Sequence, residues 1–142
     1  MVLKATEHPM PRSNQAPLKR VILTLARCKE FPEGSREYGY EFIAPLDVND
    51  RIDVSAWKQK RADCVVRHFA AGHDDITGML IHKPGGREHV QWVFDYDVSS
   101  SDDDEAGFLF GSHRFRPGEY VSVRGTDGKL TTYAVTSIEV LG

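Results

Sequence analysis

The sequence lacks the features that would assign this protein to several common classes. Its 142 residues include two cysteines, Cys28 and Cys64, without the CxxC or Cys/His spacing of a metal site or a disulfide scaffold. We therefore expect both to be small buried side chains in a reducing compartment. No apolar run approaches the roughly 20 residues of a membrane-spanning helix, and the first residues lack the apolar segment of a signal peptide. These absences predict a cytoplasmic protein without a membrane partner.

Positive charge is also scarce. Eighteen Lys and Arg residues stand against 21 Asp and Glu residues, which gives a formal net charge of -3. Because proteins dedicated to nucleic acids carry a basic excess on at least one face, the sequence argues against a nucleic-acid partner. It also contains no cofactor motif, so we expect no cofactor.

Helical patterns are scarce, which favours a β fold. A helix is credible only within residues 47–63, where we expect Ser55 to be the N-cap and both Ala56 and Trp57 to face inward. The remaining chain has about seven short alternating runs bounded by turn residues. Parallel strands would need helical crossovers that are missing here. We predict a mainly β fold: an antiparallel, partly closed small β-barrel or strongly bent sheet with one short helix.

The chain is expected to form one domain after a short leader. Residues 1–19 contain three prolines among polar residues and show no apolar periodicity, which predicts a disordered N-terminal leader. Residues 20–142 are long enough for one hydrophobic core and are interpreted as a single β-barrel-like domain.

Several strands can be assigned from their alternation. Residues 21–28, 38–46 and 64–71 are predicted strands. The second should carry Tyr38, Tyr40, Phe42, Ala44 and Leu46 on one face and end near Pro45. In the last hairpin, a three-residue loop with Gly128 in the left-handed conformation places Val121 opposite Tyr133. The apolar positions then change from odd numbers (Tyr133, Val135) to even numbers (Ile138, Val140), which predicts a bulge near residues 136–137.

The stretch from 76 to 95 is interpreted as a central β-hairpin that turns at Pro84, Gly85 and Gly86. A tight turn there places Lys83 opposite Glu88 and His82 opposite His89. One face then forms the core and carries Met79, Ile81, Val90, Trp92 and Phe94. The other face is solvated or forms a site, and it carries Leu80, His82, His89, Gln91 and Asp95.

This polar face is the candidate ligand surface. Its predicted ligand-binding residues are His82, His89, Gln91 and Asp95, joined by Arg67 and His113. Cross-strand Cβ atoms lie about 5 Å apart, so His82 and His89 are close enough to share a metal, with Asp95 as a third ligand. Because a catalytic zinc requires three protein ligands, an exposed polar face is the default and the metal is the alternative.

An acidic run, 102–105, follows the hairpin, with Asp95 and Asp97 before it. These carboxylates are numerous enough for calcium but lack the DxDxDG spacing that aims alternate side chains at one ion. We expect a solvated loop, with contact to a basic partner surface as the alternative.

Taken together, the sequence predicts a small cytoplasmic binding or interaction module that recognises a protein or a small molecule. The alternative is a metal-dependent hydrolase-like enzyme that uses the His82 and His89 pair with Asp95. For assembly, we expect a monomer or a weak homodimer formed through an exposed strand edge.

Overall fold

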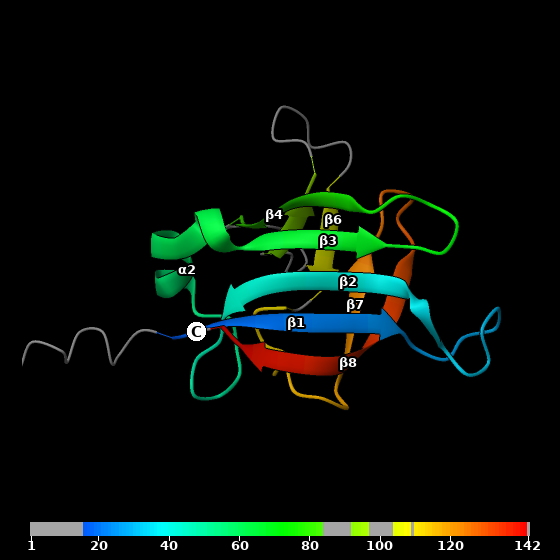
Figure 1. Ribbon diagram of the computed structural model, residues 1–142, viewed down its shortest axis with the longest axis horizontal. Coiled ribbons are helices and arrows are strands. Elements are labelled where there is room, and N and C mark those ends of the chain that lie inside the picture. The colour runs from blue at the N-terminus through cyan, green and yellow to red at the C-terminus, as the bar shows by residue number, and fades with distance from the viewer. Residues whose placement is uncertain (1–15, 84–91, 97–103, 109, 142) are drawn as a thin grey trace, which may run out of the picture.

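Eight antiparallel strands close into a barrel (Figure 1). The computed structural model describes residues 16–83, 92–96, 104–108 and 110–141. The strands are β1 (Leu18–Leu25), β2 (Ser35–Pro45), β3 (Val65–Phe69), β4 (Ile76–His82), β5 (Trp92–Asp95), β6 (Glu105–Phe108), β7 (Tyr120–Arg124) and β8 (Leu130–Val140). Each strand pairs with the next, and β8 pairs with β1. The predicted antiparallel barrel is confirmed, and it is closed.

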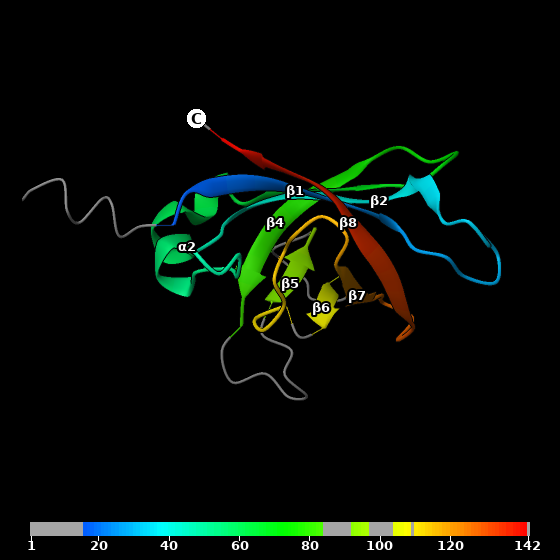
Figure 2. The same ribbon diagram turned by 90° about the horizontal axis from the view of Figure 1, so that it is seen from below.

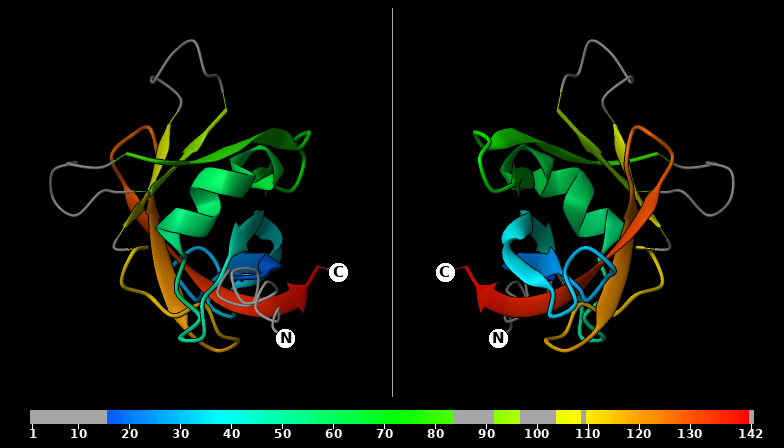
Figure 3. Two further views of the ribbon diagram at one scale, coloured as in Figure 1. Left: turned by 90° about the vertical axis from the view of Figure 1, so that its left-hand side faces the viewer. Right: turned by 90° about the vertical axis from the view of Figure 1, so that its right-hand side faces the viewer.

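The up-and-down strand order gives the barrel two different ends (Figure 2). We call the end with the β1–β2, β3–β4 and β7–β8 turns the hairpin end. The opposite end, the helix end, carries helix α2 (Val54–Lys60) and the short 3-10 helix η2 (Arg61–Asp63). Seen along the barrel, α2 lies across this opening (Figure 3). Within the described residues, no helix is long and apolar enough to cross a membrane.

Helix α2 is fixed at its start and along its inner face. Its N-cap is Asp53, whose carboxylate accepts a hydrogen bond from the Ala56 N–H at 3.0 Å. The prediction of Ser55 as the cap was wrong. Asp53 has the extended backbone that a cap requires, and it lies three residues before Ala56, whose N–H has no acceptor within the helix. Ala56 and Trp57 are buried as predicted. The Trp57 indole N–H donates to the Leu80 carbonyl at 2.9 Å, which joins the helix to β4.

The barrel interior is filled by aromatic and branched side chains from all sides. On β2 the predicted alternation is confirmed, since Tyr40, Phe42, Ala44 and Leu46 are all buried, Tyr38 is half-buried, and the strand ends at Pro45. Phe42 packs against Phe94, Phe110 and Phe115 with ring centroids 5.5, 6.0 and 5.6 Å away. This aromatic cluster blocks the middle of the barrel, so the interior is a packed core.

The β4–β5 register differs from the predicted hairpin. His82 pairs with Trp92, and Leu80 pairs with Phe94. The prediction had placed His82 opposite residue 89, so the register is displaced by three positions (92 against 89). An odd displacement exchanges the two faces of β4 relative to β5, so Leu80 and His82 face inward and Met79 and Ile81 face outward, the reverse of the prediction. On β5, Trp92 and Phe94 are in the core as predicted, and Asp95 lies on the outer face.

Burial explains this correction. Leu80, Trp92 and Phe94 are at most 1% exposed, so the observed register puts three large apolar side chains in the core together. The turn residues Pro84, Gly85 and Gly86, and the predicted partners Glu88 and His89, lie outside the described residues. Lys83 contacts Asp104 at 2.9 Å.

The last hairpin follows the prediction. Val121 pairs with Tyr133, and Gly128 has a φ of 83°, as its left-handed turn position requires. Where β8 meets β1, Ile22 pairs with Ser137 and Leu23 pairs with Val135, which leaves Thr136 as an extra residue. The predicted bulge is therefore confirmed.

Three further expectations are corrected or only partly covered. Strand β1 begins at Leu18, so the boundary predicted at residue 20 is too late, and residues 1–15 of the predicted leader lie outside the described residues. Cys64 is buried as expected, but Cys28 is exposed because β1 ends at Leu25 and the chain continues into a turn. All eight described strands are paired on both sides, so none offers the free edge of the predicted homodimer.

Exchanging the two helix-start residues for alanine should separate the true cap from the predicted one. We expect Asp53→Ala to lower the free energy of unfolding by about 1 kcal/mol, because the Ala56 N–H loses its acceptor. Ser55→Ala is the matched control and should change it by less than about 0.5 kcal/mol. Urea unfolding followed by circular dichroism measures both. Equal losses in the two variants would contradict the assignment of Asp53.

Candidate functional site

The predicted hairpin-face residues do not form one site. The His82 ring faces the core at the helix end, with its centroid 4.6 Å from that of Trp92 and 5.9 Å from that of Trp57. Burial and the nearby Lys58 lower the pKa of His82. Asp95 pairs with Met79 and lies on the outer face. His82 and Asp95 are therefore on opposite sides of the sheet, and His89 and Gln91 lie outside the described residues.

The two residues predicted to join that face are also elsewhere. Arg67 lies on the outside of β3, where its guanidinium contacts Glu41 at 2.7 Å and Asp75 at 2.8 Å. His113 follows β6, and burial lowers its pKa. Within the described part of the chain, no group of three or more His, Cys, Asp or Glu side chains is arranged to hold a metal. The predicted convergence of His82 with Asp95 on one face was therefore wrong.

A different set of polar side chains converges inside the hairpin end. Strand pairing puts them on the inner face, because Tyr40 pairs with core residue Leu23, Glu105 with Phe94, and Tyr133 with Val121. His68 pairs with Tyr40 and shares its face. These side chains come from β2, β3, β6 and β8. They line a pocket of about 230 Å³, the Glu105 pocket, together with Asp127 and Lys129 of the β7–β8 turn.

Glu105 lies at the centre of the hydrogen bonding in this pocket. Its Oε1 accepts hydrogen bonds from the Tyr40 hydroxyl at 2.9 Å and from the Tyr96 hydroxyl at 2.7 Å. The side chain is 14% exposed. Within the described residues, Oε2 has no hydrogen-bond partner. One oxygen is thus held in place, and the other is free to accept a bond from a ligand.

The phenols beside Glu105 are held in the protonated, donating form. Burial raises the pKa of Tyr40, and the neighbouring Tyr133 and the Glu105 carboxylate raise it further. Burial also raises the pKa of Tyr133, whose ring centroid is 5.1 Å from that of Tyr40. Both side chains therefore remain hydrogen-bond donors near neutral pH.

His68 forms one wall of the pocket. Its ring stacks on Tyr40, with centroids 4.4 Å apart and planes inclined by 18°. Burial lowers the pKa of His68, and the negative charge of Glu105 opposes that effect. The Nδ1 atom lies 3.9 Å from Glu105 Oε1, too far for a direct hydrogen bond. His68 therefore adds a neutral aromatic surface near pH 7.

Sequence reasoning missed most of this pocket. Glu105 was assigned to a solvated acidic loop, but it belongs to β6 and faces the interior. Its neighbour Asp104 contacts Lys83 and has a side chain only 10% exposed. The inward positions of Tyr40 and Tyr133 followed from alternation. Residues 97–103, which include Asp97, Asp102 and Asp103 of the acidic stretch, lie outside the described residues.

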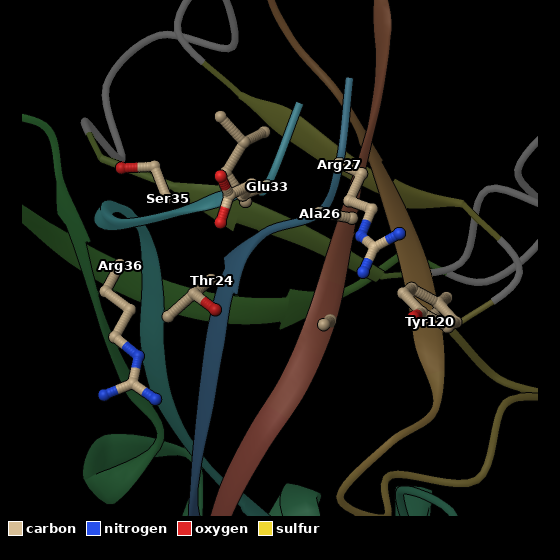
Figure 4. Close-up of a pocket in the computed structure, with 10 residues that line it drawn as sticks. Thr24, Ala26, Arg27, Glu33, Ser35, Arg36 and Tyr120 are labelled. Carbon is tan, nitrogen blue, oxygen red and sulfur yellow. The ribbon is translucent and has the colours of Figure 1, made fainter. Parts of the chain in front are cut away.

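A larger hollow of about 290 Å³ lies on the outer surface, where β1, β2 and β8 approach Tyr120. Figure 4 shows the guanidinium groups of Arg27 and Arg36 on opposite sides of it. Both arginines and Glu33 are exposed. Since no charged groups converge there, this hollow is a weaker candidate than the Glu105 pocket.

The fold and site define a closed eight-stranded antiparallel barrel with a polar pocket at its hairpin end. No protein-family model, curated protein or solved structure matches this chain. Its function has to be inferred from the site itself.

Removing the Glu105 charge should change the titration of His68. In Glu105→Gln the opposing negative charge is lost, so the pKa of His68 should fall further below its usual value. The folded protein disfavours protonated His68, so neutral His68 carries no stability penalty above the pKa that this residue has in the unfolded chain. As pH falls below that pKa, the free energy of unfolding decreases. Proton NMR of the imidazole signals measures this change. His82, at the other end of the barrel, is the internal control, and an unchanged His68 titration would contradict the proximity to Glu105.

Proposed function

We propose that this protein is a binding module for a small polar ligand, held in the Glu105 pocket. The observation that carries the proposal is the state of the Glu105 carboxylate. Two tyrosines fix Oε1, while Oε2 has no partner within the described residues. An acceptor that is positioned before the ligand arrives loses little conformational entropy on binding, which favours affinity.

The size of the pocket limits the ligand. A volume of about 230 Å³ is below the range of about 300–1,000 Å³ that is common for drug-sized ligands. Below the pocket, Phe42 and Phe94 pack the interior. The ligand is therefore a small molecule bound at the mouth, and eight-stranded barrels are wide enough to hold one such molecule.

Binding is favoured over catalysis by the contacts between the polar groups. His68 and Glu105 are not hydrogen-bonded, so they do not form a paired base. A metal-dependent hydrolase built on His82 and Asp95 has no support, since these residues face opposite sides of the sheet. We further infer a cytoplasmic location, because two free thiols suit a reducing compartment, and no nucleic-acid partner, because the net charge is -3.

An NMR screen of the full chain with a library of neutral, cationic and anionic fragments tests this proposal. We expect binding fragments to shift the backbone amide signals of Gly125, Thr126 and Thr131, which line the pocket. Glu105→Gln should weaken the cationic fragments among them about ten-fold, because the mutation replaces a charged acceptor.

The matched control is Glu41→Gln, which alters a carboxylate on the outer face that is paired with Arg20 and Arg67. It should leave fragment affinity unchanged. A screen in which no fragment shifts the pocket amides, or in which both variants behave alike, would refute binding at Glu105.

A further inference from the structure

We propose that the ligand of the Glu105 pocket is a small primary ammonium compound, whose N–H groups donate to Glu105 Oε2. This inference rests on the proposed function and names the ligand class of the same site. It is carried by the charges that line the pocket, by the unpartnered oxygen and by the way the aromatic rings are packed.

Negative charge exceeds positive charge in the lining. Glu105 and Asp127 supply two carboxylates against the single ammonium of Lys129, and His68 adds an imidazole. Asp127 already caps its own turn, since its Oδ1 accepts the Lys129 backbone N–H at 2.9 Å. With His68 neutral, two carboxylates less one ammonium leave one negative charge. A cationic ligand removes this imbalance.

Within the described residues, Glu105 has no lysine or arginine as a counter-ion. Within the described residues its ion-pair contact is with His68 at 3.9 Å, and no lysine or arginine pairs with it. Its side chain is only 14% exposed, so solvent compensates its charge poorly. A mostly buried carboxylate without a cationic counter-ion is costly, and a bound ammonium both neutralises the charge and donates a hydrogen bond to Oε2.

The aromatic walls favour a primary over a quaternary ammonium. A quaternary ion binds by contact with open ring faces and cannot donate a hydrogen bond. Here Tyr40 is 2% and Tyr133 8% exposed, so their faces are covered by neighbouring side chains. A primary ammonium instead donates directly to Oε2 and needs no open ring face.

Anionic and neutral ligands fit less well. A carboxylate or phosphate would be repelled by the negative charge of Glu105, whose Oε2 has no hydrogen-bond partner within the described residues. A neutral alcohol donates one hydrogen bond but leaves the carboxylate without a counter-ion. The expected order of affinity is therefore ammonium, alcohol, anion.

Four matched probes test the inference on the full chain: n-butylammonium, butanol, tetramethylammonium and butyrate. Each is titrated while the amide signals of Gly125, Thr126 and Thr131 are followed by NMR. We expect butylammonium to bind about ten-fold or more tightly than butanol, because a charge-assisted hydrogen bond replaces a neutral one. Tetramethylammonium and butyrate should give no saturable shift.

Two variants sharpen the test. Glu105→Gln should weaken butylammonium about ten-fold and leave butanol nearly unchanged, since only the ammonium uses the charge. Glu41→Gln, on the outer face, should leave all four probes unchanged. The dispersion of the amide spectrum confirms that both variants are folded.

The outcomes separate this inference from the proposed function. If butanol binds as tightly as butylammonium at these amides, the ammonium class is refuted while a small-ligand site remains. If no probe binds, the ammonium class is refuted, and the fragment screen decides separately whether the pocket binds anything. A further titration with Nα-acetyl-lysine methylamide distinguishes two origins of the ammonium group. Binding as tight as that of butylammonium, or tighter, indicates a lysine side chain, and loss of binding indicates a free small amine.

Discussion

Pairing between β1 and β8 is the constraint on which the rest of the structure depends. It brings the two ends of the sheet together and converts one face into an enclosed interior. The extra residue Thr136 lets β8 bend, so that the same strand pairs with β7 on one side and β1 on the other. Closure also brings Tyr133 of β8 within 5.1 Å of Tyr40 of β2, measured between ring centroids. The pocket therefore exists only in the closed barrel.

The two ends of the barrel differ in the side chains that close them. At the helix end, Trp57 covers the core, and its indole N–H donates to the Leu80 carbonyl. At the hairpin end, polar side chains occupy inward positions where apolar ones would pack more simply. Keeping the Glu105 carboxylate there has a stability cost, because among the described residues only one oxygen of this partly desolvated charge has hydrogen-bond donors. Polar groups that conflict with good packing are typical of functional sites.

Local patterns predicted those parts of the fold that depend on neighbouring residues. Alternation identified the buried face of β2, and the parity change after Val135 identified the bulge at Thr136. Patterns failed where a local signal conflicted with the packing of the core. Pro84, Gly85 and Gly86 suggested a tight turn, but pairing Leu80 with Phe94 in the core set the β4–β5 register. In the same way Asp53, not Ser55, has the extended backbone of a helix cap.

The sequence by itself determined that the chain forms short antiparallel strands and which side chains of a strand share a face, because a period of two residues is a property of the local backbone. The tertiary structure alone decided which faces meet. Tyr40 and Glu105 are 65 positions apart and contact each other only because closure sets β2 and β6 around one interior. In the sequence, Glu105 was the last residue of an acidic run. Its inward position depends on the register with Phe94, which no local pattern reveals.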